Sequence, residues 1–473
     1  MYIGILRNRV FNKNFLLIYN YAIIYYFRFV KIQIPNTFLP EKKYIVDTFF
    51  SEFLALDYSI EISESKNYKV ILDNKNFIEI EDAFWSNLDE NTGYLHKENI
   101  PKTVTRTKNE FFDDELIIIY GNDKLEIDKN RIYCGIDIFA SAFFILSRWE
   151  EAVFDKKDKH GRFPCELSLA QRNNFQYKAI VNEYVEMLWN MLVRLGCNQQ
   201  RKTRKFQIIP THDVDTFLRF INLKTALKAI VGDIVKRKSL KTAIESTSQY
   251  IKFKFNLDND PFDTFDYLMN ISEKYGVKSH FYFIAGKIGE YDVNYNFLNQ
   301  EVKKTIFKII EKGHFVGIHG SYNSFDNESQ YLQEANRFKS IGIEPYESRQ
   351  HYLRLKIPET WHNLIKAKIK IDSSIAFTND SGFRAGVCYE YKLFDVKQRK
   401  ILDLKEQPLI FMETTTRFKY NTPEKFFKHL NHLKKVVKKF KGQFVFLWHN
   451  SNINNFYWKE FSKNYKSIFE DTD

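Results

Sequence analysis

The second half of the chain predicts an α/β fold, a deformed (β/α)7-type barrel, and the first half predicts a smaller α+β domain. Strand-like and helical runs alternate regularly beyond residue 206, as they do in parallel sheets. Before that point the two kinds of run follow no such order. A polar, basic stretch at residues 196–205 separates the two patterns and predicts a linker.

Length and composition support more than one folded domain. The chain has 473 residues, with 44% hydrophobic and 27% charged, which is typical of a globular protein of two or three domains. We expect an apolar leader over residues 1–34, an accessory α+β domain over 35–200 and the (β/α) barrel over 201–473. The leader is apolar from Phe15 to Val30, but Arg28 interrupts it, and it is short for a membrane span. A poorly packed extension and a membrane-surface anchor both remain open for it.

Charge and cysteine content limit which partners and which cellular compartment are expected. The net charge is +12, which favours anionic partners, but no nucleic-acid-binding signature is present and no nucleic acid is expected. The four cysteines, at positions 134, 165, 197 and 388, show no CxxC spacing. Reduced thiols, and hence a cytoplasmic protein that could touch a membrane, fit this pattern. The oligomeric state is left open.

The first half predicts a few helices and strands without a catalytic pattern. Its expected elements are a helix over Tyr44–Leu56, strands over Tyr68–Leu72 and Leu116–Tyr120, and helices over Ile136–Trp149 and Ala179–Leu195. His160 lies close in sequence to two acidic residues, Asp155 and Asp158. This group favours a solvated loop over a binding site.

Polar or ionisable residues follow most of the predicted strands of the second half. The expected strands are Phe206–Pro210, Ser279–Ile284, His314–Ile318, Pro345–Ser348, Ile369–Ile371, Leu409–Met412 and Gln443–Trp448. The residues at or just past their ends include Asp213, Asp215, His319, Arg349, His351, Glu413 and His449. Because the carboxyl ends of parallel strands converge on one face, these side chains predict an active site there.

Helices of suitable length lie between these strands, and one insertion stands apart. Phe265–Tyr275, Val302–Lys312 and Glu424–Lys439 predict the connecting helices. Leu223–Ile251 is a basic amphipathic insertion with apolar residues near a 3.6 period. We expect its apolar face to pack across the barrel, with contact to a membrane surface or an anionic partner as the alternative.

The segment from Pro210 to Asp215 carries the strongest chemical signal. Asp213 and Asp215 follow a buried strand, and their spacing places both carboxylates on one face if the chain stays extended. Charge at such a position is costly unless it binds a cation or does chemistry. One carboxylate could hold a metal while the other takes a proton from water. An Asx-type turn that merely closes the strand is the alternative.

Taken together, these residues resemble the polysaccharide deacetylases of carbohydrate esterase family 4. The resemblance covers the chain from about Phe206 onward. It implies a barrel that hydrolyses acetyl groups on sugars with one divalent metal ion, zinc in the first place and cobalt or nickel as the alternatives. The first half is similar to the uncharacterised domain that often precedes such barrels, in Phe144–Glu151 and Gly161–Phe163.

The resemblance implies roles for individual residues. Asp213 matches the catalytic base and Asp215 the metal ligand that follows it, while His319 matches the first histidine ligand. The second histidine of that motif is replaced by Asn323, a weaker ligand for a zinc-like ion, so His351 is a rival third ligand.

Further motifs supply the remaining machinery. Arg349 matches the arginine that orients the base, and His449 matches the histidine acid. The candidate substrate contacts are His351, Tyr322 and Arg384. Six further histidines are expected to be structural or solvated: His212, His280, His314, His362, His429 and His432.

The physical logic predicts a metal-dependent hydrolase. A cation held by Asp215, His319 and a third group would acidify water and polarise an amide carbonyl, Asp213 would accept the proton, and His449 would protonate the departing amine. The expected substrate is an N-acetylated sugar of a surface polysaccharide or its precursor. A relative that binds glycan without cleaving it, and a hydrolase of another non-peptide carbon–nitrogen bond, are the alternatives.

Overall fold

The computed structural model describes residues 29–220, 223–235, 238–287, 289 and 291–470, which form two compact units. Within the described residues, the first unit comprises 29–94, 103–143 and 183–203, and the second comprises 95–102, 144–182 and the chain from 204 onward. The predicted linear division at residue 200 lies near the last of these boundaries. Residues 144–182, however, pack with the second unit rather than with the accessory domain that precedes it in sequence.

The first unit is built on a six-stranded sheet with the order β2-β1-β3-β4-β8-β7. Its strands are β1 (Val30–Pro35), β2 (Tyr58–Ser63), β3 (Tyr68–Ile71), β4 (Phe77–Ile80), β7 (Gly121–Ile127) and β8 (Arg131–Ile136). A separate pair is formed by β5 (Thr105–Asn109) and β6 (Phe112–Ile118). The strands predicted at residues 68–72 and 116–120 are thus confirmed as β3 and part of β6.

Strand β1 overlaps the end of the predicted leader. Val30, Ile32 and Ile34 are fully buried and alternate with residues that are less buried, as expected of a strand that packs on one face. The prediction that residues 30–34 belong to a poorly packed leader is therefore wrong, because they pair with β2 and β3 in the sheet. The rest of the leader, residues 1–28, lies outside the described residues.

The helices of the first half follow the predicted positions. The helix predicted over residues 44–56 is α2 (Leu39–Asp47) followed by a π-helical turn (Thr48–Leu54). The next two predicted helices are α3 (Ile138–Leu146) with α4 (Trp149–Val153), and α6 (Ile180–Arg194). A short helix, α5 (Leu169–Arg172), begins at a Ser168 cap whose hydroxyl accepts from the Gln171 amide.

The second unit contains a nine-stranded sheet in which all seven predicted strands are found. They are β9 (Gln207–Val214), β10 (His280–Phe283), β11 (Phe315–Gly320), β12 (Glu347–Gln350), β13 (Ile371–Asp372), β16 (Phe411–Met412) and β17 (Gln443–Leu447). Every pairing among these seven strands is parallel. Their carboxyl ends therefore lie along one edge of the sheet, as the sequence predicts.

The sheet does not close into the predicted barrel. Its order is β14-β15-β13-β12-β11-β10-β9-β17-β16, and no pairing joins the two ends among the described residues. Beyond β13 the sheet continues into an antiparallel pair, β14 (Tyr391–Asp395) and β15 (Lys400–Glu406). The mixed α/β class is confirmed, while the closed barrel is corrected to an open sheet that an unpredicted hairpin extends at one edge.

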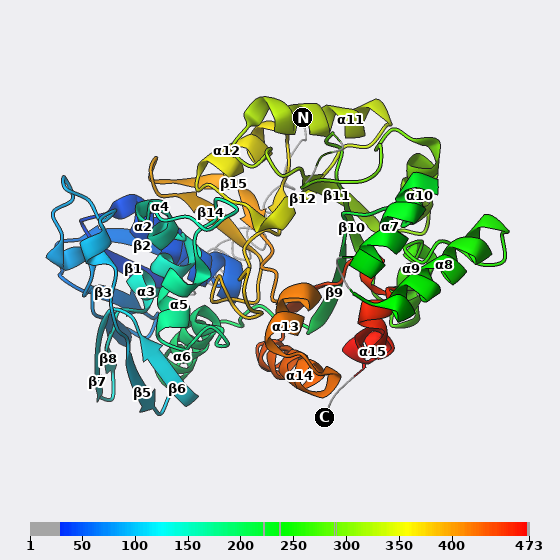
Figure 1. The fold of residues 1–473 in the computed structure, drawn as a ribbon. Coiled ribbons are helices and arrows are strands. Elements are labelled where there is room, and N and C mark those ends of the chain that lie inside the picture. The colour runs from blue at the N-terminus through cyan, green and yellow to red at the C-terminus, as the bar shows by residue number, and fades with distance from the viewer. Residues whose placement is uncertain (1–28, 221–222, 236–237, 288, 290, 471–473) are drawn as a thin grey trace, which may run out of the picture. The chain divides into compact units, whose positions relative to one another are not determined.

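Helices connect the parallel strands and surround them (Figure 1). They are α9 (Phe265–Lys274), α10 (Gln300–Glu311), α11 (Glu328–Ser340), α12 (Glu359–Lys366), α13 (Glu413–Lys419), α14 (Pro423–Lys439) and α15 (Lys459–Ser462). Side chains of Asn299, Asn327 and Thr422 cap α10, α11 and α14 by accepting a backbone N–H of the first turn. The described part of the chain contains no helix both long and apolar enough to cross a bilayer.

The basic insertion forms a helical hairpin of α7 (Leu223–Val235) and α8 (Leu240–Lys254), which pack against each other. Its helical character is confirmed. The prediction that its apolar face packs across the barrel is wrong, since Leu227, Val231 and Ile244 are more than half exposed. The hairpin buries small and polar side chains instead, among them Ala226, Asp233 and Ser246.

Candidate metal and catalytic site

The parallel sheet brings the predicted site residues together at the carboxyl ends of its strands. Asp213 lies in β9 and Asp215 just past it, His319 lies near the end of β11, Arg349 lies in β12, and His449 lies two residues past β17. Because β9, β11 and β12 run parallel in one sheet, these positions converge on one edge. Both carboxylates point the same way, since His319 Nε2 lies 3.6 Å from Asp213 Oδ2 and 3.3 Å from Asp215 Oδ1.

Asp215, His319 and His351 form a group with the spacing of a metal centre. One ligand atom from each lies within 4.8 Å of the others. His351 Nε2 is 3.5 Å from Asp215 Oδ1, and both histidines are buried. Two imidazoles and one carboxylate are ligands that zinc and related ions accept, and three protein ligands leave a further position open.

Hydrogen bonds fix which ring nitrogen of each histidine faces the group. His319 Nδ1 lies 2.8 Å from the Arg349 carbonyl oxygen, which can only accept, so Nδ1 carries the proton and Nε2 presents a lone pair. His351 Nδ1 lies 3.3 Å from Asp292 Oδ1, which orients this ring in the same way. Such outer contacts are typical of histidines that hold a metal.

The electrostatics of the group suit a cation. Asp215 Oδ1 is buried and makes no hydrogen bond. Burial would raise the pKa of Asp215, but the imidazoles of His351, His319 and His449 around it hold it well below its usual range. Burial would lower the pKa of His351, but the Asp215 and Asp292 carboxylates raise it to about 9. An ionised carboxylate oxygen without a hydrogen bond, facing two imidazoles, fits a divalent ion.

A buried arginine holds Asp213 in place. Arg349 NH1 donates to Asp213 Oδ1 at 3.0 Å and to the Thr211 hydroxyl at 2.7 Å. The rest of the guanidinium is fixed by the carbonyl and hydroxyl of Ser373, both at 2.9 Å. This pairing fixes the Asp213 carboxylate beside a buried positive charge.

His449 is oriented by Glu413, which follows β16 and begins α13. Glu413 Oε1 lies 2.6 Å from His449 Nδ1 and also accepts the His449 backbone N–H and the Asn452 amide. His449 Nε2 consequently faces the site, 3.5 Å from Asp215 Oδ2. Burial would lower the pKa of His449, but Glu413 and then Asp215 raise it to about 10.

The predicted third ligand, Asn323, is engaged elsewhere. Its side-chain oxygen accepts from Arg354 at 3.4 Å, and the residue lines a pocket of about 440 Å³ with Asp292 and Glu334. The rival candidate His351 lies in the group with Asp215 and His319. Asp292, which supports His351, was missed by sequence reasoning, because it sits in the long loop between β10 and α10 without a strand or motif next to it.

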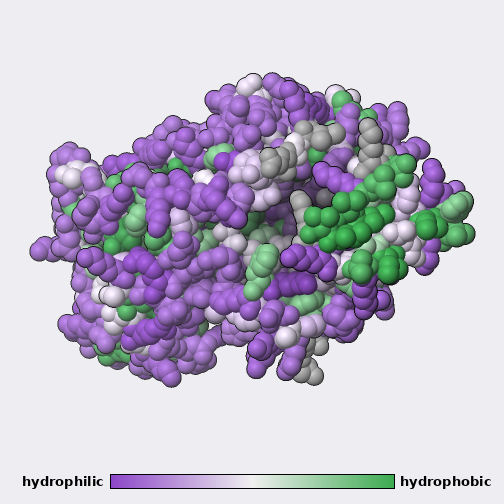
Figure 2. All heavy atoms as spheres, in the orientation of Figure 1, coloured by the Kyte–Doolittle hydropathy of each residue, from purple (hydrophilic) through white to green (hydrophobic). Residues whose placement is uncertain are grey.

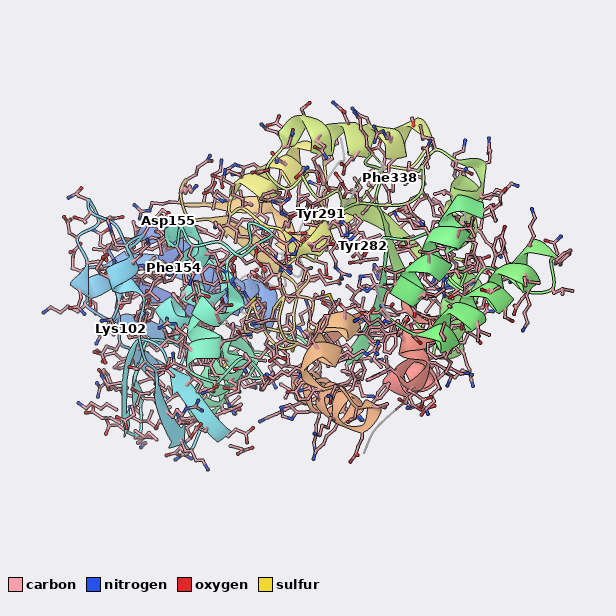
Figure 3. All side chains as sticks on the ribbon, in the orientation of Figure 1. Lys102, Phe154, Asp155, Tyr282, Tyr291 and Phe338 are labelled. Atoms are coloured by element: carbon pink, nitrogen blue, oxygen red, sulfur yellow. The ribbon has the colours of Figure 1, made fainter. Side chains whose placement is uncertain are left out.

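The predicted substrate contacts differ in accessibility. Arg384 is buried and ion-paired with Glu151 at 2.6 Å, so it fastens residues 144–182 to the segment between β13 and β14 and is not open to a substrate. Tyr322 lies in a cluster of rings that includes His160, Tyr291 and Tyr352. Tyr352 follows His351 directly and is partly exposed, as is Tyr291, which Figure 3 labels.

His160 joins this ring cluster from the first half of the chain. Its Nδ1 lies 3.0 Å from the Tyr322 hydroxyl, and its ring centroid is 4.7 Å from that of Tyr352. Arg162 donates to the Tyr352 carbonyl at 2.8 Å. The prediction of a simply solvated loop is wrong. Only the tertiary structure shows that this loop reaches the residues after β12.

The other histidines differ in their surroundings. His212 is structural, as predicted, with Nδ1 2.7 Å from the Trp448 carbonyl. His314 and His429 are buried rather than solvated, and His280 and His362 pair with Glu347 and Asp395, each at 2.8 Å. His432 is exposed. His314 lies 3.3 Å from Glu273 of α9 and the His429 ring stacks on Tyr420, and the sequence pattern reveals neither partner.

The solved structures to which the chain is similar include two deacetylases. A putative polysaccharide deacetylase from Mycobacterium smegmatis is 13% identical over 56% of this chain and 83% of its own, with a TM-score of 0.36. The chitin deacetylase of the fungus Colletotrichum lindemuthianum is 13% identical over 56% of this chain and 85% of its own, with a TM-score of 0.27. Comparison with curated proteins gives no match. Residues 30–196 match DUF7033, a family of unknown function, so the chain carries a DUF7033 region ahead of the strands that form the site.

Proposed function

We propose that this protein is a metal-dependent hydrolase that removes acetyl groups from N-acetylated sugars of a surface polysaccharide or its precursor. The observation that carries the proposal is the convergence of Asp215, His319 and His351 beside a second carboxylate, Asp213, that is hydrogen-bonded to a buried arginine. A histidine with its own carboxylate partner, His449 with Glu413, reaches the same point. These are the parts that the motif resemblance implies.

Asp215, His319 and His351 would hold one divalent ion, for which zinc is the first candidate and cobalt or nickel the next. When bound, such an ion supplies Lewis acidity that polarises an amide carbonyl and acidifies water. His351 takes the third position in this assignment because it faces Asp215, whereas Asn323 is turned to Arg354.

The protein's own groups then handle the protons. Asp213 accepts a proton from the attacking water, and Arg349 holds its carboxylate in position to do so. His449 donates a proton to the departing sugar amine, because its raised pKa keeps it protonated at neutral pH. Glu413 holds the ring so that Nε2 points inward.

The ring cluster beside His351 would contact the sugar. Tyr291 and Tyr352 are exposed by roughly two-fifths of their surface, next to a proposed ligand residue. Aromatic rings offer apolar faces with polar edges, which suits a sugar ring. In this assignment Tyr322 and His160 support the exposed rings, and the buried Arg384 is a structural residue.

Two other functions are favoured by particular observations. The displaced motif residue Asn323 favours a relative that binds glycan without cleaving it. The same groups could also hydrolyse another non-peptide carbon–nitrogen bond, such as a cyclic imide, since none of them selects an acetyl group by itself.

Acetate release tests the proposal. Purified wild type and Asp213→Asn would be assayed on a panel of N-acetylated glycans with zinc, cobalt or nickel added. We expect acetate from the wild type only, with equal metal content in both proteins. Metal without acetate on any glycan would contradict the deacetylase assignment, and ring opening of a cyclic imide or amide, seen as a new carboxylate in the product, would favour the second alternative.

A further inference from the structure

The α7–α8 hairpin is inverted relative to an ordinary surface hairpin. The side chains that it buries are small or polar: Ala226, Asp233, Thr242, Ala243 and Ser246. The side chains that it exposes are large and apolar: Leu223, Leu227, Val231, Ile234, Val235, Leu240, Ile244, Ile251, Phe255 and Leu257, each exposed by more than two-fifths. A surface helix normally directs its apolar stripe toward the core.

A buried polar network fixes the hairpin in this orientation. The Asp233 carboxylate accepts from the Ser246 hydroxyl, and Arg219 donates to Ser246 at 2.5 Å and to Asp233 at 3.4 Å. Ser239 caps α8 by accepting the Thr242 amide. Turning either helix to bury its apolar stripe would expose these paired groups and place Leu and Ile side chains against them, so the inverted orientation is built in.

The exposed residues form one continuous apolar surface. Within α7 they recur three or four positions apart, at 223, 227, 231 and 234, and α8 repeats the pattern at 240 and 244. Figure 2 shows the corresponding hydrophobic spheres gathered over α7 and the adjoining part of α8. Contiguous apolar patches of this kind on a protein surface mark contact sites for another protein or a membrane.

The charged side chains beside this apolar surface favour an anionic membrane over a second copy of the protein as its partner. Among the described side chains of the hairpin and the turn after it, the exposed charged ones are Lys228, Lys238, Lys241, Lys252 and Lys254, with Glu245 and Asp258 of the opposite sign. A second copy seated on this face would bring the lysines against their own equivalents, which opposes association. Anionic lipid headgroups complement them, and lysines flanking an apolar stripe are typical of helices that lie in a membrane interface.

We propose that the α7–α8 hairpin docks the protein on membrane surfaces that carry anionic lipid. The apolar stripe enters the boundary between headgroups and acyl chains, and the lysines contact the headgroups. The hairpin follows within eight residues of Asp215 in sequence, on the connection that leaves β9 at its carboxyl end. The docking depends on the surface alone and not on the proposed catalytic activity.

Vesicle co-sedimentation of the full chain tests this proposal. The probes are vesicles of phosphatidylcholine alone and vesicles that also contain phosphatidylserine. We expect sedimentation with the anionic vesicles, weakened at high salt. The triple substitution Leu227→Ser, Val231→Ser and Ile244→Ser should reduce binding more than tenfold, and Lys228→Glu with Lys252→Glu should reduce it by a similar factor.

A matched control separates docking from general surface hydrophobicity. Ile62, Val193 and Ile401 are exposed apolar residues elsewhere, and their replacement by Ser should leave binding unchanged. Circular dichroism would check that every variant is folded. No binding by the folded wild type, equal binding to both vesicle types, or a self-association that the hairpin substitutions abolish would each overturn the proposal.

Discussion

Glu413 Oε1 lies 2.6 Å from His449 Nδ1, and this contact determines which nitrogen of His449 faces Asp215. Glu413 belongs to α13 and His449 to the turn after β17, so the pair joins two neighbouring strand ends. The carboxylate also accepts the His449 backbone N–H at 2.9 Å. Glu413 thus positions the ring and, in the proposed mechanism, acts only through it.

Replacement of Glu413 by Gln tests that positioning role. An amide keeps the size of the side chain but removes the charge that orients and stabilises a protonated ring. We expect kcat for acetate release to fall about 10–100-fold, the usual range for a group that supports a site residue, with KM nearly unchanged. Steady-state kinetics check this. An unchanged kcat would show that His449 needs no orientation by Glu413.

His160 tests whether the first half of the chain takes part in substrate binding. His160→Ala removes the contact with the Tyr322 hydroxyl and the packing on Tyr352. We expect KM for an N-acetylated oligosaccharide to rise several-fold, by about 1 kcal/mol of lost binding, while kcat and metal content stay near the wild-type values. The exposed His432→Ala variant is the control. Equal KM values for both variants would contradict the assignment.

The raised pKa of the buried Glu334 carboxyl group leads us to expect that the stability of the second unit depends on pH. This carboxyl group on α11 accepts the Ser321 amide at 3.0 Å and the Ser321 hydroxyl, and burial raises its pKa from 4.5 to about 7. Between those two pH values the folded protein keeps a proton that the unfolded chain has lost. Stability from this group is therefore present at low pH and is lost as pH rises toward 7.

Urea unfolding of wild type and Glu334→Gln at several pH values between 4.5 and 8 would isolate this contribution. We expect the wild type to lose stability relative to the variant by up to about 3 kcal/mol across the range, since one pKa unit corresponds to about 1.36 kcal/mol. A constant difference between the two proteins over the whole range would contradict the raised pKa of Glu334.

The positions of the predicted strands and of most site residues could be derived from the sequence. Asp213, Asp215, His319 and His449 each lie in or just past an apolar run. Arg349 lies in a short polar strand, β12, and parallel pairing of these strands is enough to bring the residues together. Strand pairing depends on local pattern and regular connections, which a single sequence displays.

What escaped prediction depends on contacts between distant segments. Asp292 and His160 reach the site from loops whose course no periodicity encodes. β15 alternates buried residues with exposed ones such as Lys400 and Asp403, which hides its strand character in a charged stretch. The exposure of the α7–α8 stripe also could not be foreseen, because a helical period shows which residues share a face but not which way the face points.

The metal content of His351→Ala compared with Asn323→Ala tests the central assignment most directly. Both variants and the wild type would be purified and loaded with zinc ions. Bound metal would be measured after the excess ion is removed. We predict about one metal per chain for the wild type and Asn323→Ala, and a loss of tenfold or more in zinc affinity for His351→Ala, because a ligand is removed. Full occupancy in His351→Ala together with loss in Asn323→Ala would contradict the centre formed by Asp215, His319 and His351.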